Sequence, residues 1–315
     1  MRGDFRRYLR AKRTVDDRAL DRRLVGTLRE RLAQRADARE GPLRVLEIGA
    51  GIGTMPARLL KWDVLPPGAI RYVALDVDAD SIDAVEPYLR SWAADRSAST
   101  SGGDPIEIEW SNRRVELQAV ASEAVAYAER AVGEFDAIVG AALLDVLGVD
   151  ELETLLGALA PGGICYFPIT FDGGTRFRPS HPADRTIEQY YHEHMDAKPE
   201  GSSRAGGDVL ERLRTIDGTR VLGAAGSDWV VRPVDGEYPA DEAYFLRCIL
   251  NTVEAAVGEV AGDAFQDDLE GWLDRRRDQL EAAELLYLTH QIDVLGRVRA
   301  SSAGGRDRGR PKDNS

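Results

Sequence analysis

Short apolar runs alternate with helical stretches along the middle of the chain. Each run is apolar over most of its length and short enough to be a strand; the runs cover residues 43–48, 70–76, 115–120, 135–144 and 162–171. The intervals at 54–62, 80–95 and 149–160 have helical patterns, with Pro87 as a kink or restart in the second. Strands this apolar that alternate with helices indicate a parallel sheet covered on both faces. The pattern predicts a doubly wound α/β fold.

Local signals refine this outline. Asp150 and Glu153 have capping-box spacing at the start of the helix over 149–160, and the sequence PGG at 161–163 is expected to end it. The polar stretch SASTSGGDP at 97–105 is predicted to be a loop.

The two ends of the chain differ from the middle. Leucines at three-to-four spacing over 5–38 predict one or two amphipathic helices, so residues 1–40 form an N-terminal helical segment. Residues 172–219 contain no strand pattern and are expected to be a helical insert, or lid, at an acceptor site. A strand over 220–233, two helices and a last strand over 285–298 follow. The main domain is therefore expected to cover 41–299, and the polar, Gly-rich tail at 300–315 to be disordered.

The sequence VLEIGAGIGTMPARLL at 45–60 places three glycines directly after the first predicted strand. A dinucleotide fingerprint, G-x-G-x-x-G, would need its third glycine at Thr54. The spacing here is instead E-x-G-x-G-x-G, from Glu47 through Gly49 and Gly51 to Gly53. Glycines after a strand let the backbone approach a ligand that a Cβ would push away. The loop therefore predicts a small-molecule site.

This glycine series resembles the first motif of the class I S-adenosylmethionine-dependent methyltransferases. YVALDVDADSI, FDAIVGAALLDVL and LAPGGICYF resemble that family's later motifs, in the right order. The resemblance covers residues 43–171 well and 220–298 more loosely. It implies a seven-stranded sheet, mostly parallel with an antiparallel last strand, plus N-terminal helices and a helical insert after strand 5.

The resemblance also implies cofactor contacts. S-adenosylmethionine is the expected cofactor, and residues 47–54 would hold its methionine end, Asp76 its ribose and Val77 its adenine. The cofactor-binding residues expected on this basis are Glu47, Gly49, Ala50, Gly51, Gly53, Asp76, Val77 and Ser122. Alternatives stay open: Asp76 could cap a helix, Glu47 could pair with an arginine, and Ser122 could be a plain helix cap.

A small-molecule methyl acceptor fits the sequence better than a macromolecule. The segment GAALLDVL lacks the Asn/Asp-Pro-Pro-aromatic signature of methylases that modify base or glutamine amide nitrogens. No stretch interleaves basic and aromatic residues as an RNA-stacking surface would. Titratable and aromatic groups crowd the insert at 172–219, which makes it a plausible acceptor pocket.

The catalytic candidates are Asp145, His181 and His192. Asp145 follows the fourth strand and is left free because Asp150 is expected to cap the next helix; it could equally have no function. The histidines lie in the insert, and each could equally belong to a solvated amphipathic helix that serves as a lid. Two residues of a helix that are two positions apart face different ways, so the HEH sequence at 192–194 predicts no metal site. Arg13 and Arg18 could clamp a carboxylate or be solvated. GSDW at 226–229 and HQID at 290–293 receive no role from the sequence.

Composition limits the partners. The 315 residues are 43% hydrophobic, and no run approaches the roughly 18 uncharged apolar residues of a membrane span, so no membrane partner is expected. The start of the chain lacks the apolar stretch of a secretory signal, which predicts a cytoplasmic protein. A net charge of −13 argues against a nucleic-acid partner, and few lysines among many acidic residues suit a salt-rich, halophilic cytoplasm. The two cysteines predict neither a disulfide framework nor a metal cluster.

Three other functions stay open at this point: a protein or RNA methyltransferase, a non-catalytic S-adenosylmethionine-binding protein, and a nicotinamide-dependent oxidoreductase. The sequence does not decide the oligomeric state.

Overall fold

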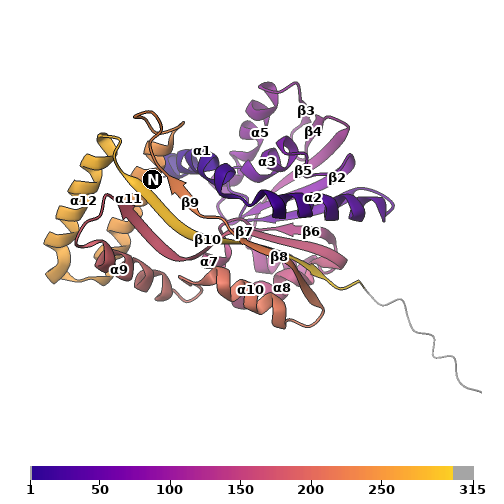
Figure 1. Ribbon diagram of the computed structural model, residues 1–315. Helices are drawn as coiled ribbons and strands as arrows, with labels where there is room; N and C mark the ends of the chain where they lie inside the picture. The colour runs from indigo at the N-terminus through magenta and orange to yellow at the C-terminus, as the bar shows by residue number, and fades with distance from the viewer. Residues whose placement is uncertain (1, 301–315) are drawn as a thin grey trace, which may run out of the picture.

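A single mixed sheet organises the computed structural model, which describes residues 2–300 (Figure 1). Its seven central strands stand in the order β5-β2-β1-β6-β7-β10-β8. Their bounds are β1 Leu43–Ile48, β2 Gly68–Asp76, β5 Arg113–Ala121, β6 Phe135–Val139, β7 Leu159–Arg178, β8 Thr219–Gly226 and β10 Leu286–Val298. The strands from β5 to β7 pair in parallel, and β10 runs antiparallel to both of its neighbours. The expected seven strands, mostly parallel with a reversed last strand, are therefore confirmed as the centre of the sheet, and β3, β4 and β9 extend it to ten strands within the described residues.

Apolar side chains of the central strands point alternately to two faces, as the pleat of a strand requires. On β1, Leu43 and Val45 join one buried cluster, whereas Leu46 and Ile48 join the other. The first cluster is covered by the helices α1 Arg2–Ala19, α2 Arg22–Asp37, α3 Thr54–Lys61 and α5 Val85–Ala94. The second is covered by α6 Ala124–Arg130, α8 Leu152–Gly157 and α10 Ala205–Thr215. Both faces are covered, which is why the strands are apolar on both sides.

The N-terminal segment forms two helices, and both pack into the larger core. Val15 of α1 and Leu28 and Leu32 of α2 are almost fully buried there. Asp21 caps α2, because its carboxylate accepts hydrogen bonds from the backbone N–H groups of Arg23 and Leu24.

The strands β7 and β10 extend well past the parallel strands and carry an additional lobe. Figure 1 shows α11 and α12 beside their far ends, away from β1 and β2. The lobe consists of α9 Asp184–Asp196, the strand β9 Trp229–Val231, α11 Glu242–Val260, the short η2 Asp263–Phe265 and α12 Gln266–Glu281. It is joined to α1, which packs against both α11 and β9.

Several sequence-based boundaries are wrong. The polar loop expected at 97–105 contains β3 Ser99–Gly102, which pairs with β4 Ile106–Trp110. Strand β4 buries only Ile106 and Ile108, so its short alternating pattern lacked the continuous apolar run used to recognise strands. The strand expected at 135–144 ends at Val139, because Ala142 has a φ of +50° that a strand cannot continue.

Strand β7 is longer than expected at both ends. It already includes the PGG sequence, and it continues to Arg178, so the insert begins only after that residue. The preceding helix is correspondingly shorter: η1 Val149–Glu151 leads into α8, whose start has no side-chain cap. The predicted capping box is therefore wrong, and Glu153 pairs with Arg212 instead.

Two further segments are divided. The strand expected at 220–233 breaks into β8 and β9 around Ser227 and Asp228. The helix expected at 80–95 becomes α4 Ala79–Ile82 and α5, and Pro87 lies in the first turn of α5, which confirms a restart. No helix of the described chain has the length and apolar character needed to cross a membrane. The tail expected to be disordered lies, apart from residue 300, outside the described residues.

Candidate functional site

The loop after β1 has a backbone that requires glycine. Gly49 and Gly51 have φ values of +68° and +53°, in the left-handed region that favours glycine. A Cβ at Gly49 would lie 2.9 Å from a methyl carbon of Leu143, and one at Gly51 would lie 2.9 Å from a methyl carbon of Leu9. The glycines therefore let two elements far apart in sequence, α1 and the segment after β6, approach this loop.

Asp76 lies at the end of the neighbouring strand and binds the loop directly. Its Oδ2 accepts a hydrogen bond of 2.7 Å from the Gly51 N–H, and its Oδ1 accepts one of 2.9 Å from the Asp78 N–H. Val77 follows with 73% of its surface exposed. The Ser122 N–H donates to the Asp76 carbonyl over 2.9 Å, because the parallel strands β2 and β5 end together. The structure thus brings Gly51, Asp76, Val77 and Ser122 to one edge of the sheet.

Glu47 lies behind the loop rather than at its surface. It is 3% exposed, and its Oε2 accepts a hydrogen bond of 2.8 Å from the Tyr72 hydroxyl. Burial raises the pKa of Glu47 to about 8, although Tyr72 and the nearby Arg58 favour the charged form. At pH 7 this side chain is therefore mostly neutral. Its contribution to cofactor binding stays a prediction.

A cavity of about 390 Å³ opens above the glycine loop. Gly49, Gly51 and Asp76 line one part of it, and Asp145, Tyr191 and Tyr287 line another. The walls come from α1, the segment between β6 and α7 Leu144–Leu147, the strands β7, β9 and β10, and the helices α9 and α11. The cavity lies at the carboxyl ends of parallel strands, where ligands bind in open α/β sheets.

Asp145 projects from the first turn of α7 into this cavity. Its Oδ1 atom is buried and has no hydrogen-bond partner within the described part of the chain. Burial raises the pKa of Asp145 to about 6, against the opposing effect of the Lys12 ammonium. Burial also raises the pKa of Tyr191 to about 12, with a smaller contribution from Asp145. A carboxylate with an unused acceptor oxygen in a cavity is placed to bind a donor or to accept a proton.

Two segments that line the cavity, one after β6 and one within β7, have strained backbone. Ala142 and Ile169 have φ values of +50° and +58°, and the Ala142 N–H donates to the Pro168 carbonyl over 3.0 Å. Positive φ in a β-branched residue such as Ile169 is rare and costs free energy. The buried carboxylate of Asp293 holds this conformation by accepting a hydrogen bond of 2.8 Å from the Ile169 N–H. Both strained residues line the cavity.

The two candidate histidines occupy different positions. The His192 ring lies 3.2 Å from the Thr175 hydroxyl and packs against the edge of Phe171, which lines the cavity. Partial burial lowers the pKa of His192. His181 lies before α9, where its Nδ1 accepts a hydrogen bond from the Ala183 N–H. The structure does not bring His181 to the cavity lining, and catalytic roles for both residues stay predictions.

Sequence reasoning missed the contribution of α1. Phe5, Tyr8, Leu9 and Lys12 line the cavity, and Lys12 is only 9% exposed. The spacing of Phe5, Tyr8 and Lys12, at three and four residues, is the signal that they share a helix face. Arg13 and Arg18, which the sequence offered as clamps, pair instead with Asp17 and Glu242.

The motifs GSDW at 226–229 and HQID at 290–293 lie side by side, because β9 pairs with the start of β10. The Asp228 carboxylate lies 2.8 Å from His290 Nδ1, and Trp229 donates its indole N–H to Asp16 over 3.1 Å. Asp293 also accepts a hydrogen bond of 3.0 Å from the Asp21 N–H. These contacts join α1 and α2 to the lobe formed by β9 and β10.

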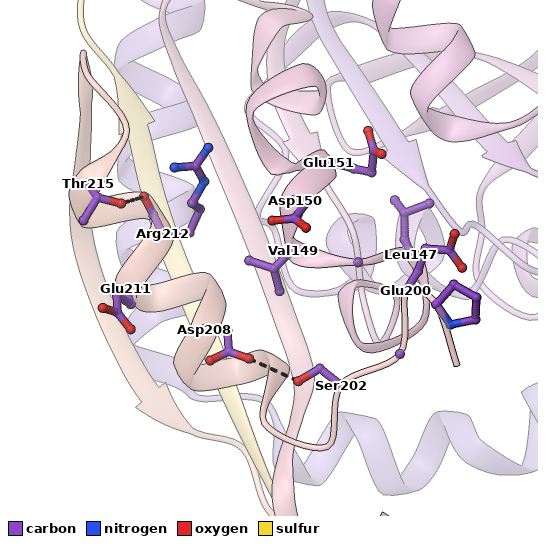
Figure 2. Close-up of a pocket in the computed structure, with 13 residues that line it drawn as sticks. Leu147, Val149, Asp150, Glu151, Glu200, Ser202, Asp208, Glu211, Arg212 and Thr215 are labelled. Carbon is purple, nitrogen blue, oxygen red and sulfur yellow. Dashed lines mark hydrogen bonds between the residues drawn. The ribbon is translucent and has the colours of Figure 1, made fainter. Parts of the chain in front are cut away.

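A second hollow, of about 640 Å³, lies outside this site between η1 and α10. Figure 2 shows Asp208, Glu211 and Arg212 on α10 across from Asp150, with Ser202 donating to Asp208 over 3.1 Å. It contains none of the glycine-loop residues. Its relation to the cavity is indirect: the Ser202 N–H donates to the Asp145 carbonyl over 3.3 Å.

Over residues 2–300, no three His, Cys, Asp or Glu side chains gather where they could hold a metal ion. Neither Cys165 nor Cys248 forms a disulfide within the described residues.

The strand order decides the fold family. Two parallel strands, β2 and β5, follow β1 on one side, and β6, β7, the reversed β10 and β8 follow on the other. The fold is that of the class I methyltransferases.

Comparison with known proteins gives similarities to solved structures at low sequence identity. No protein-family model and no curated protein matches the sequence. An S-adenosylmethionine-dependent methyltransferase from Thiobacillus denitrificans, solved with S-adenosyl-L-homocysteine, is 15% identical with a TM-score of 0.43, over 89% of this chain and 93% of that one. A cyclopropane synthase from Mycobacterium tuberculosis is 14% identical with a TM-score of 0.42, over 87% of this chain and 82% of that one.

Proposed function

We propose that the protein transfers a methyl group from S-adenosylmethionine to a small-molecule acceptor. The observation that carries this proposal is the single cavity that has Gly49, Gly51 and Asp76 at one part and, at another, the Asp145 carboxyl group, whose buried Oδ1 has no hydrogen-bond partner among the described residues. One cavity can therefore hold a cofactor and an acceptor side by side.

The residues of the loop fit the cofactor. Gly49 and Gly51, with Ala50 and Gly53 beside them, would let the methionine end approach the backbone, since both line the cavity and have no Cβ. Asp76 would accept hydrogen bonds from the ribose hydroxyls through the lone pairs that Gly51 and Asp78 leave free.

Three further residues complete this end of the site. Val77 is exposed and would pack against the adenine, with Ser122 beside it. Lys12 lines the same cavity from α1, with its ammonium held by the Asp16 carboxylate.

When bound, the sulfonium group supplies its own leaving group, so the chemistry needs no metal. The chain itself has to hold the acceptor in line with the methyl carbon and to exclude water. Tyr8 on α1, Tyr191 on α9 and Tyr287 on β10 surround the cavity from three sides. Asp145 lies among them and would orient the acceptor or remove a proton from it.

The shape and charge of the cavity favour a small molecule over a nucleic acid or a protein. Helices α1, α9 and α11 enclose it, so a large substrate would have to displace them. Its lining ammonium, Lys12, already pairs with both carboxylate oxygens of Asp16, at 2.9 and 2.8 Å. A surface that binds phosphates needs cations that are free to contact them.

The experiment that tests this proposal follows the label from methyl-labelled S-adenosylmethionine in an extract of the source cells. Purified protein should place the label in the small-molecule fraction, and the variant Asp76→Ala should not. Asp83→Asn, an exposed change near the same strand end, should label as the unmodified protein does. Label in protein or RNA would favour a macromolecular acceptor, and no label with intact cofactor binding would favour a non-catalytic binding protein.

A further inference from the structure

The acceptor part of the cavity has an unusual concentration of aromatic rings. Its lining includes six of them: Phe5, Tyr8, Phe171, Tyr191, Trp229 and Tyr287. The face of an aromatic ring attracts a cation, and several rings around one space form the kind of cage that binds ammonium groups. Aliphatic side chains such as Leu9, Leu143 and Ile249 make up the rest of the apolar wall.

Three residues of the lining have a buried polar atom for which no hydrogen-bond partner is described, and one of these atoms, the Thr289 hydroxyl, can donate or accept. The other two atoms can only accept: Asp145 Oδ1 and the side-chain carbonyl oxygen of Gln291, a residue that is 2% exposed. Neither has a hydrogen-bond partner among residues 2–300. Leaving a buried acceptor unpaired is costly, so the ligand that completes this site should bring N–H or O–H donors.

The charge that Lys12 brings into the cavity does not oppose a cation. Its ammonium is held by both oxygens of Asp16 and lies 5.0 Å from the centre of the Trp229 ring. The positive charge is therefore offset inside α1, whereas Asp145 makes no ion pair within the described residues. The acceptor part of the cavity thus contains one carboxyl group, that of Asp145, for which no ion pair is described.

We infer that the methyl acceptor is an amine, which enters as an ammonium ion, donates to Asp145 and is surrounded by Tyr8, Tyr191 and the neighbouring rings. This inference rests on the proposed function and adds the chemical class of the acceptor to it. Asp145 is then a catalytic residue, because it contacts the nitrogen that reacts.

The proton balance follows from this placement. The Asp145 carboxylate takes one proton from the ammonium group, which frees the nitrogen lone pair. That lone pair forms the bond to the methyl carbon, and the electron pair of the broken carbon–sulfur bond stays on sulfur. The methylated nitrogen keeps the positive charge, and Asp145 releases its proton to solvent.

The test is calorimetry on the protein saturated with S-adenosylhomocysteine. Three probes of similar shape are titrated in turn: 2-phenylethylamine, which is cationic, 2-phenylethanol, which is neutral, and 3-phenylpropanoate, which is anionic. The amine should bind at least about 10-fold more tightly than either of the others, because only it matches the carboxylate and the rings. Equal binding of the three probes, or no binding of the amine, would overturn the inference.

Variants separate Asp145 from its surroundings. Asp145→Asn should weaken amine binding by about 10-fold or more and leave the affinity for S-adenosylhomocysteine unchanged. Asp150→Asn, five residues further on and outside the cavity, is the matched control and should change neither affinity. Tyr191→Phe should retain the amine, whereas Tyr191→Leu should lose part of the binding, since only the ring is needed.

A pH series adds a readout that a merely structural role would not move. Amine binding should strengthen between about pH 5 and pH 7 as Asp145 ionises, and this dependence should vanish in Asp145→Asn. The charged and titratable groups that face Asp145 are Lys12 and Tyr8 of α1 and Tyr191 of α9.

The outcomes distinguish this inference from the proposed function. If Asp145→Asn weakens S-adenosylhomocysteine instead of the amine, the carboxylate serves the cofactor and the inference is wrong. If the unmodified protein does not bind S-adenosylhomocysteine at all, the proposed function itself fails.

Discussion

Trp229 donates its indole N–H to the Asp16 carboxylate over 3.1 Å, although 213 residues separate them. The same carboxylate holds Lys12, so an edge strand of the lobe and the first helix share one buried group. Because α1 also carries Tyr8 and Leu9 over the glycine loop, this contact fixes one wall of the cavity. The lobe therefore contributes to the site by positioning α1 as well as by lining the cavity.

Trp229→Phe should lower the free energy of unfolding by about 1–3 kcal/mol, because Asp16 stays buried and loses a donor. The amide hydrogens of α1 should also exchange faster. Trp110→Phe is a suitable control, since Trp110 lies on β4, packs against Trp92 and makes none of the contacts described for Asp16. Equal loss of stability in the two variants, measured by chemical denaturation, would contradict a special role for the Asp16 contact.

Arg18→Met should destabilise the fold clearly more than Arg13→Met. Arg18 pairs with Glu242, whose side chain is fully buried. The other hydrogen bond described for that carboxylate comes from the Thr14 hydroxyl, at 2.8 Å. Arg13 pairs with Asp17 at 3.5 Å on the helix surface, a geometry worth less than about 1 kcal/mol. Since Arg18 is half exposed, we expect a loss of about 2 kcal/mol for it, below the full value of a buried pair. Melting temperatures of the two variants, measured side by side, check this order.

Glu47→Gln should stabilise the protein increasingly as the pH rises. The folded pKa of Glu47, about 8, lies above its ordinary value of 4.5, so the unfolded chain ionises first. In the wild type, the contribution of neutral Glu47 to the free energy of unfolding is fully present below about pH 4.5. This contribution is lost as the pH rises towards 8, because the unfolded chain ionises before the folded one. A glutamine does not titrate, so the melting temperature of the variant minus that of the wild type should grow from pH 5 to pH 8.

The control for this series is Glu109→Gln, an exposed change on β4. Its difference from the wild type should stay flat over the same range. A flat or falling difference for Glu47→Gln would show that Glu47 is charged in the folded protein.

Asp76→Ala should weaken binding of S-adenosylhomocysteine by about 10-fold or more, because the ribose hydroxyls would lose a charged acceptor. The same change removes the hydrogen bond from the Gly51 N–H, so part of the loss would come from a looser loop. Asp76→Asn retains one acceptor oxygen and should fall between the wild type and the alanine variant. Unchanged binding in both, measured by calorimetry, would place the ribose elsewhere.

Much of the fold could be predicted because it follows local patterns. The apolar runs predicted the five parallel strands, and parallel strands bring their carboxyl ends together, which placed Gly51 near Asp76. The wall of the cavity that α1 forms could not be predicted this way. Lys12 and Tyr8 belong to an amphipathic helix whose polar face is read as solvated, and only the packing of α1 on β9 and α11 buries them.

The missed strand ends have a similar cause. Residues 172–178 contain Gly173 and Gly174 and several polar side chains, which is a loop signal by local rules. Their pairing with β10 overrides that signal, since the register continues to Arg178 opposite Leu286. Strand β3 has the same character, because Ser99–Gly102 becomes a strand only through its partner β4.

The measurement that tests the central claim most directly is a calorimetric titration of the purified protein with S-adenosylhomocysteine and, separately, with NADH. We expect saturable one-site binding of S-adenosylhomocysteine and no binding of NADH, because α3 begins with Thr54 where a dinucleotide loop needs its third glycine. Tight binding of NADH with no binding of S-adenosylhomocysteine would contradict the account.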